Sequence, residues 1–263
     1  MLTNRRTFLN QMVAGSVAAP FVARDLIAAP PSGTLRLAAF GASGMAYFTL
    51  DGIARHKSVK LACVAEVDST KLTQLKQKYP EAKVYQDWRE MLVKEKGQVD
   101  IACVGTPDHM HAPMAMGAMR QGLPVYIQKP LAHDLFEVRK LTEMARKHKL
   151  VTQMGIQVHS SSEYQTAVRL IQSGAIGKVK EVHAWSVKKW GDTEPIPDRT
   201  DPVPAGLNWD QWLGVAAARP YVDGLFHPGN WRKRIDFGTA TFGDMGCHIY
   251  DPVFGALALG SQL

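Results

Sequence analysis

The position of Lys129 in the sequence is poorly explained by a role as an ordinary solvent-exposed lysine. It comes directly after a short apolar run, Val125-Tyr126-Ile127, and one glutamine, and Pro130 follows it. An apolar run of this length is typical of a buried strand. Ligands of an open parallel sheet bind beyond the carboxyl ends of its strands, so we expect the Lys129 ammonium group to face a ligand. The competing interpretation is a solvated lysine that leaves a strand.

Asp244 and His248 form a second group of residues that could take part in catalysis, close to the end of the chain. If residues 243–256 are helical, these two residues lie on one face, four positions apart, and Asp251 shares that face. A histidine with an ordinary pKa of about 6.5 is suited to accept a proton near neutral pH, and a neighbouring carboxylate can orient it. The alternative is a solvated ion pair on a helix surface.

A glycine-containing turn follows the first apolar run of the main part of the chain. Residues 35–40 are apolar, and Gly41-Ala42-Ser43-Gly44-Met45-Ala46 leads into a helical pattern that reaches residue 55. A strand, a glycine turn and a helix form the phosphate-binding start of a dinucleotide site. Ser43 occupies the position of the usual second glycine and Ala46 that of the third, so a plain tight turn is the alternative.

An acidic residue stands where such a site binds the adenosine ribose. Residues 59–64 read as the second strand, and Glu66 follows, about 20–25 residues after the glycine turn. A carboxylate at this place favours NAD, with NADP as the alternative, because it would repel a 2′-phosphate. Asp68 is placed to cap a helix that opens at Ser69.

The pattern of strands and helices continues as far as Gly155. The fourth, fifth and sixth strands are expected at residues 99–104, 124–127 and 151–154, with helices between them. This alternation predicts an α/β protein with a doubly wound parallel sheet. The loop after residue 104 contains two histidines, His109 and His111, but they lack a third metal ligand at a convincing spacing. We expect this loop to cover the nicotinamide side of a dinucleotide instead.

The amino terminus resembles an export signal. Arg5 and Arg6 are followed by Phe8-Leu9 and a mildly apolar run over residues 12–23, which is too short to span a membrane. Paired arginines in this setting resemble a twin-arginine signal, so we expect export to the periplasm without a stable membrane anchor. We divide the chain into a twin-arginine signal and linker (1–33), a dinucleotide-binding Rossmann domain (34–155) and a second, incomplete α+β domain for substrate and catalysis (156–263).

Composition narrows the possible partners. The net charge is +7, and no nucleic-acid motif accompanies it, so nucleic acid is not expected as a partner. The three cysteines are far apart, and Cys63 and Cys103 lie in apolar runs that read as buried strands. We therefore interpret these two as core residues rather than as part of a disulfide framework or zinc site.

The motifs taken together resemble the glucose–fructose oxidoreductase / inositol dehydrogenase / MocA (Gfo/Idh/MocA) family over residues 34–263. The resemblance implies catalytic roles for Lys129, Asp244 and His248. Gln128 departs from the glutamate that usually precedes the lysine in this family. The resemblance and the glycine turn together assign cofactor binding to Gly41, Ser43, Gly44, Met45, Glu66, Thr106, Pro107, His111, Gln128 and Lys129.

The family resemblance also implies an activity. It predicts hydride transfer between NAD(P) and a secondary alcohol of a sugar or polyol, by a protein that is a homo-oligomer when full length. A glycosidase that oxidises its sugar only transiently is the alternative. Family members continue beyond residue 263 with more strands, whereas here residues 180–188 read as one long strand. We therefore also consider that this polypeptide alone acts as a dinucleotide-binding module with little turnover.

Overall fold

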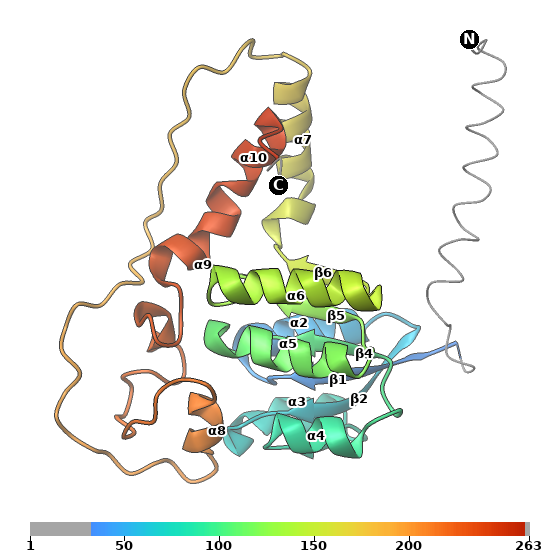
Figure 1. The fold of residues 1–263 in the computed structure, drawn as a ribbon, viewed down its shortest axis with the longest axis vertical. Helices are drawn as coiled ribbons and strands as arrows, with labels where there is room; N and C mark the ends of the chain where they lie inside the picture. Colours follow the sequence, from blue (N-terminus) through green and yellow to red (C-terminus); the bar gives the residue numbers. More distant parts are fainter. Residues whose placement is uncertain (1–32, 261–263) are drawn as a thin grey trace.

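A computed structural model describes residues 33–260 of the chain and contains a single parallel sheet (Figure 1). The strands lie in the order β3-β2-β1-β4-β5-β6, and every neighbouring pair is parallel. The doubly wound sheet expected from the sequence is confirmed. The strands are β1 (Leu35–Phe40), β2 (Val59–Ala65), β3 (Lys83–Tyr85), β4 (Ile101–Val104), β5 (Val125–Gln128) and β6 (Thr152–Gly155).

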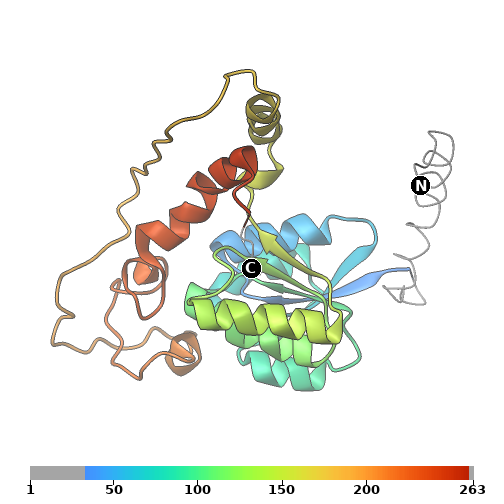
Figure 2. The same ribbon diagram turned by 45° about the horizontal axis from the view of Figure 1, so that its top comes forward.

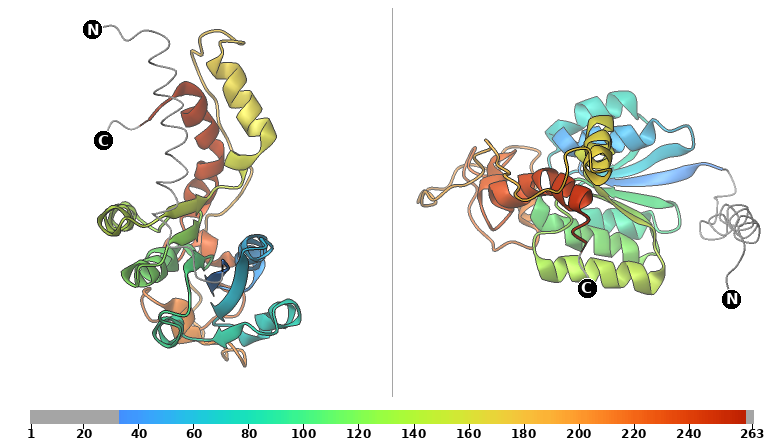
Figure 3. Two further views of the ribbon diagram at one scale, coloured as in Figure 1. Left: turned by 90° about the vertical axis from the view of Figure 1, so that its right-hand side faces the viewer. Right: turned by 90° about the horizontal axis from the view of Figure 1, so that it is seen from above.

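Helices cover both faces of this sheet (Figure 3). Side chains from α2 and α3 pack against one face, and side chains from α4, α5 and α6 pack against the other. Parallel sheets are usually buried on both sides in this way. The helices and short helical turns of this part are α2 (Gly44–Ala54), η1 (Ser69–Leu72), α3 (Thr73–Lys78), α4 (Trp88–Lys94), η2 (Asp108–Met110), α5 (His111–Arg120) and α6 (Leu135–His148).

The first strand shows why the sequence adopts this arrangement. Its side chains alternate between the two faces, with Leu37 and Ala39 in the core under α2, and Ala38 and Phe40 in the core under α5. All four residues are at most 1% exposed. A strand buried on both faces has to be apolar at successive positions, which is why residues 35–40 carry so strong a signal in the sequence.

The second half of the chain reaches over the carboxyl ends of the strands. An aromatic cluster that includes Trp212, Phe226 and Phe237 packs against Val67, just after β2. Asn208 donates its backbone N–H to the carbonyl of Val67 at 2.8 Å. The elements of this half are η3 (Val158–Ser160), α7 (Ser162–Gln172), α8 (Trp209–Leu213), η4 (Asn230–Lys233), α9 (Ala240–Ile249) and α10 (Asp251–Leu257).

Two expectations for this half were wrong in detail. Residues 180–188 form no strand. Their trace runs as a loop along the outer side of the structure (Figure 2), and no other strand in residues 33–260 pairs with them. The helix expected over 243–256 is divided at Tyr250 into α9 and α10. Pro252 lies in the first turn of α10, where its lack of an N–H interrupts the hydrogen-bond pattern of a continuous helix.

The export motif lies outside the described residues, so export to the periplasm stays a prediction. Within residues 33–260, none of the helices combines the length and the hydropathy needed to cross a bilayer.

Candidate active site

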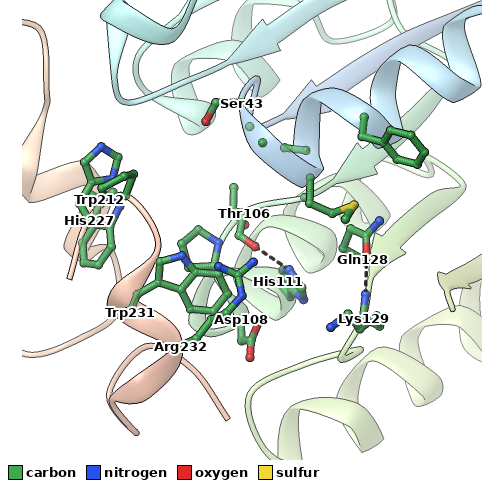
Figure 4. A pocket seen from close by; sticks show the side chains of 18 of the residues that line it. Ser43, Thr106, Asp108, His111, Gln128, Lys129, Trp212, His227, Trp231 and Arg232 are labelled. Atoms are coloured by element: carbon green, nitrogen blue, oxygen red, sulfur yellow. Dashed lines mark hydrogen bonds between the residues drawn. The ribbon is translucent and has the colours of Figure 1, made fainter. Parts of the chain in front are cut away.

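A cavity of about 770 Å³ lies beyond the carboxyl ends of the strands. This is the place where open α/β sheets bind their ligands. Residues from both halves of the chain line it, as Figure 4 shows for ten labelled side chains. The expected site residues found in its lining are Gly41, Ser43, Gly44, Met45, Glu66, Thr106, Pro107, His111, Gln128, Lys129, Asp244 and His248.

The glycine turn leaves no room for a side chain at its base. Gly41 has a φ of +90°, and a Cβ built on it would lie 2.9 Å from the Cβ of Ala46. Gly105, at the end of β4, is equally tight, because its Cβ would lie 2.7 Å from the Cα of Ala46. Glycine at these two positions therefore allows α2 to begin close to β1 and β4.

The start of α2 is open toward the cavity. Ser43 is the N-cap residue, but its side chain makes no capping hydrogen bond. A Cβ on Gly44 would meet nothing within 4 Å. Helix N-termini attract anions through their unpaired backbone N–H groups and their dipole. The first turn of α2 is therefore suited to bind a phosphate, with the Ser43 hydroxyl as an additional donor.

Glu66 follows β2 and is only 7% exposed. Its two carboxylate oxygens accept backbone hydrogen bonds, from Ala42 at 2.8 Å and from Asp68 at 3.0 Å. Burial raises the pKa of Glu66, and these two bonds oppose the rise. A carboxylate has about four acceptor positions, so Glu66 can still accept from ribose hydroxyls. Asp68 caps η1 by accepting from the backbone of Thr70, as expected.

His111 joins the ends of β4 and β5. Its Nδ1 lies 2.7 Å from the carbonyl oxygen of Pro130, and its Nε2 lies 2.8 Å from that of Thr106. The ring is fully buried. Its contacts are therefore with the backbone, and they hold the Thr106-Pro107 loop against the segment that carries Lys129. The other histidine of this loop, His109, is also buried, and its Nε2 lies 3.3 Å from the carbonyl oxygen of Trp212.

Gln128 is buried and joins β5 to α2. Its Nε2 donates to the Thr49 hydroxyl at 2.6 Å, and its Oε1 accepts from the backbone N–H of Lys129 at 3.2 Å. The Thr49 hydroxyl in turn donates to the carbonyl of Met45 at 2.9 Å. The Thr49 hydroxyl therefore accepts one hydrogen bond from the Gln128 amide and donates one to the carbonyl of Met45.

Lys129 and Asp244 form an ion pair between the two halves of the chain. Lys129 Nζ donates to Asp244 Oδ1 and to the backbone carbonyl of Asp244, each at 2.7 Å. The two side chains are only 12% and 14% exposed. An ammonium group has three N–H donors, so one remains for a substrate oxygen in the cavity.

His248 lies one helical turn after Asp244 on α9 and is half-buried. Burial lowers its pKa, Lys129 lowers it further, and Asp244 and Asp251 act in the opposite direction. The neutral ring is therefore favoured at neutral pH. The sequence suggested that Asp244 orients this histidine, but the Asp244 carboxylate contacts Lys129 instead. His248 Nδ1 is buried without a hydrogen-bond partner among residues 33–260. Asp251 pairs with His159 Nδ1 at 2.7 Å.

Three residues of the site were not identified from the sequence. Asp108 is 4% exposed and accepts a hydrogen bond from the Thr239 hydroxyl at 2.8 Å, which connects the loop after β4 to the start of α9. Burial raises the pKa of its carboxyl group. Arg232 and Lys188 also line the cavity. Asp108 lies between Pro107 and His111, which the sequence assigned to cofactor binding, whereas Lys188 and Arg232 are distant in sequence from every assigned residue.

The residues present fit a dinucleotide. The positions of Gly41 and Gly105 give the close approach of backbone that a pyrophosphate needs. The start of α2 provides anion-binding N–H groups, and Glu66 provides a ribose acceptor about 25 residues further on. The fold and the cavity thus define a protein of the dinucleotide-binding Rossmann class.

Comparison with family models agrees with this class. A model described as an oxidoreductase family, NAD-binding Rossmann fold, matches residues 35–156, and a second one, an oxidoreductase family C-terminal alpha/beta domain, matches residues 165–260. The two matches together take in most of the chain, which belongs to the Gfo/Idh/MocA family of NAD-binding oxidoreductases.

The relatives include dehydrogenases of polyols. The chain is 25% identical to the inositol 2-dehydrogenase of Corynebacterium glutamicum (strain R) over 56% of its own length and 44% of that enzyme. It is 26% identical to the rhizopine catabolism protein MocA of Rhizobium meliloti, over 86% of this chain and 71% of that protein.

A solved structure shows the same fold. Myo-inositol 2-dehydrogenase from Lactobacillus plantarum matches with a TM-score of 0.51 and 26% identity, over 56% of this chain and 43% of that one. The chain therefore spans less than half the length of the two inositol dehydrogenases.

Proposed function

We propose that this protein transfers hydride between NAD and a secondary alcohol of a sugar or polyol. The observation that carries the proposal is the ion pair between Lys129 and Asp244, which lies in the cavity together with His248. Two inositol dehydrogenases among its relatives act on polyols by name, which supports the substrate class. NAD supplies the hydride acceptor when it is bound.

The residues around the cavity divide the work of binding the cofactor. The first turn of α2, with Ser43 and Gly44, binds the pyrophosphate, and Glu66 accepts from the adenosine ribose. Met45, which is 44% exposed, lies at the same end of the cavity. The loop of Thr106, Pro107 and His111, and Gln128 beside it, line the nicotinamide end. The negative charge of Glu66 disfavours a 2′-phosphate, so NADP should bind more weakly than NAD.

Lys129 and His248 act on the substrate hydroxyl. The remaining N–H of Lys129 donates to the reacting oxygen and stabilises the negative charge that develops on it. His248 accepts the hydroxyl proton, since its lowered pKa keeps the ring neutral. Asp244 holds the ammonium group of Lys129 in place.

Substitution of the two residues tests these roles. With NAD and a panel of inositols and hexoses, we expect His248→Ala and Lys129→Met each to lower kcat/KM by about 10²–10⁴-fold. NADH affinity should change little. His159→Ala and Lys140→Ala are matched controls outside the cavity and should keep the rate of the unchanged protein. Absence of NADH formation from every alcohol in the panel would contradict the proposal.

The pH profile gives an independent check on His248. Because its pKa is lowered, the neutral base predominates at pH 7, and kcat/KM should fall only as the pH drops below the ordinary histidine pKa of about 6.5. A rate that kept rising well above pH 7 would assign the proton to a different group.

The glycosidase alternative is separated by the net redox change. Stoichiometric NADH indicates the dehydrogenase, whereas glycoside cleavage without accumulating NADH indicates transient oxidation. Two of the relatives named above are inositol dehydrogenases by name, which supports the first reaction. If this polypeptide binds NADH but turns over no alcohol, it behaves as the cofactor-binding module considered above. Export to the periplasm and assembly into a homo-oligomer remain parts of the proposal.

A further inference from the structure

Arg232 stands in the wall of the cavity opposite the cofactor-binding turn. It belongs to η4, and its guanidinium carbon lies 4.2 Å from the centre of the Trp231 ring and 5.9 Å from that of Trp190. Figure 4 shows it beside Trp231, with Thr106, Asp108 and His111 across the same space. Contacts with two indole rings restrict the motion of this long side chain before any ligand binds.

Most of the hydrogen-bond donors of Arg232 are not used. A guanidinium group has five N–H donors in a rigid fork. In residues 33–260, Nη1 makes one long bond of 3.4 Å to the carbonyl of Gly229, and Nε lies 3.7 Å from Asp244 Oδ1. The second distance is too long for a hydrogen bond. The side chain is 29% exposed and lines the cavity, so a ligand can reach the remaining donors.

Trp190 is fixed to the helix that carries the candidate catalytic residues. Its backbone N–H donates to the Thr241 hydroxyl at 2.8 Å, and its carbonyl accepts from the Thr241 backbone N–H at 2.8 Å. These bonds hold Trp190 at the first turn of α9, ahead of Asp244 and His248. Arg232 and Trp190 therefore have a defined position relative to the reacting groups.

The positive charge of Arg232 is only partly compensated by nearby carboxylates. Asp244 already forms two hydrogen bonds with Lys129 through its side chain and carbonyl, which leaves it a distant partner for Arg232. A further cation is near, because Lys188 Nζ lies 5.9 Å from the centre of the Trp190 ring. This part of the cavity wall therefore presents positive charge and unused N–H donors to a ligand that supplies oxygen acceptors.

We propose that Arg232 and Trp190 form a substrate subsite that takes a pair of neighbouring oxygen atoms on the sugar or polyol. The guanidinium fork donates two parallel hydrogen bonds to that pair, and the indole provides an apolar face for the carbon ring. A carboxylate and a vicinal diol both present such a pair, and bidentate contact with a guanidinium is strongest for the carboxylate. The subsite rests on the proposed function, because it assumes a polyhydroxy substrate.

Binding measurements on the NADH-loaded chain test the subsite without requiring turnover. The probes are D-glucuronate, D-glucose and myo-inositol, each titrated by calorimetry or saturation-transfer NMR. We expect Arg232→Met to weaken binding of at least one probe by about tenfold or more, because charge-assisted pairs of hydrogen bonds are lost. Arg232→Lys should not restore it, since an ammonium group keeps the charge but lacks the planar fork.

Lys233→Met is the matched control, because it removes the neighbouring positive charge on η4 from outside the cavity lining. It should leave probe binding unchanged, and all three variants should bind NADH as the unchanged protein does. Loss for glucuronate alone identifies the oxygen pair as a carboxylate, and loss for the neutral probes identifies it as a diol. Unaltered binding of every probe by Arg232→Met overturns the subsite.

Together with a turnover assay of the same variants with NAD, the binding measurements also separate this proposal from the proposed function. Arg232-dependent binding of a probe without any NADH formation supports the subsite and counts against the dehydrogenase. Turnover that is insensitive to Arg232→Met supports the dehydrogenase and overturns the subsite. If the NADH-loaded chain binds none of the probes, the polyhydroxy substrate is wrong and the subsite falls with it.

Discussion

Residues 35–155 and residues 178–206 contain similar kinds of apolar side chains, but only the first region forms helices and strands. The first region forms a complete sheet covered on both faces, with Leu37 and Val104 fully buried. The second region has no helix or strand, and its Trp185 and Val187 are 78% and 87% exposed. Apolar character alone therefore does not make a strand, because the backbone also needs neighbouring strands with which to pair.

The difference extends to the candidate site. Lys129 is positioned by β5, which pairs with strands on both sides. Asp244 and His248 are positioned by α9, which is held by single contacts such as Thr239 to Asp108 and Lys129 to Asp244. One half of the site thus belongs to a cooperative core, and the other half depends on a few polar contacts with that core.

The largest expected difference between the regions comes from deleting apolar side chains. Leu37→Ala should lower the free energy of unfolding by about 2–5 kcal/mol, because it leaves a cavity in a packed core. Trp185→Ala removes a larger side chain but should change it by less than about 0.5 kcal/mol, since the ring is mostly in solvent. Urea unfolding followed by far-UV circular dichroism measures both.

A large loss of stability in Trp185→Ala would break the comparison. It would mean that the segment around Trp185 is covered in solution, for example by association with other chains. Gel filtration of the same variant distinguishes that case, because it would show a shift in apparent size together with the loss of stability.

Strand pairing also explains how far the fold could be predicted from the sequence. Long apolar runs such as residues 35–40 and 99–104 coincide with buried strands, because burial on both faces leaves a strong signal. The three-residue β3, Lys83–Tyr85, was not located, because it is short and lies at the edge of the sheet. The prediction of a strand over 180–188 was wrong for the opposite reason, since the apolar signal is present but none of the strands in residues 33–260 pairs with it.

The candidate site was predictable where motifs are local. The glycine turn, Glu66 and Lys129 each follow a strand directly, and all of them line the cavity. The contact between Lys129 and Asp244 spans 115 residues, and only the family resemblance brought the two together. Asp108 owes its importance to a contact between the halves, and Arg232 to packing within the second half, which local spacing does not reveal.

A smaller effect is expected at the close approach of α2 to the sheet. Gly105→Ala should lower the free energy of unfolding by about 1–3 kcal/mol, because the new methyl group would lie against the backbone of Ala46. It should also weaken NADH binding, since the turn at the start of α2 must shift. Thermal unfolding with and without NADH reports both effects.

Gly52→Ala, within α2 itself, is the control for Gly105→Ala. A Cβ at Gly52 meets nothing within 4 Å, so this change should stabilise α2 by about 0.5–1 kcal/mol. Equal effects of the two substitutions would show that glycine at position 105 is not required by the approach of α2.

The smallest expected difference between paired substitutions concerns Gln128, which joins β5 to α2 where the family usually has glutamate. Gln128→Met leaves the Thr49 hydroxyl and the Lys129 N–H without their partner and should cost about 1–3 kcal/mol. Gln128→Glu should cost less than about 1 kcal/mol, because hydroxyl groups rotate. Thr49 can then donate to the carboxylate instead of to Met45, and the carboxylate still accepts from Lys129. Gln153→Met on β6, an exposed control, should stay within about 0.5 kcal/mol. Denaturant unfolding of the three variants should therefore rank Gln128→Met as the least stable, and an equally large loss in Gln128→Glu would show that the amide itself is required.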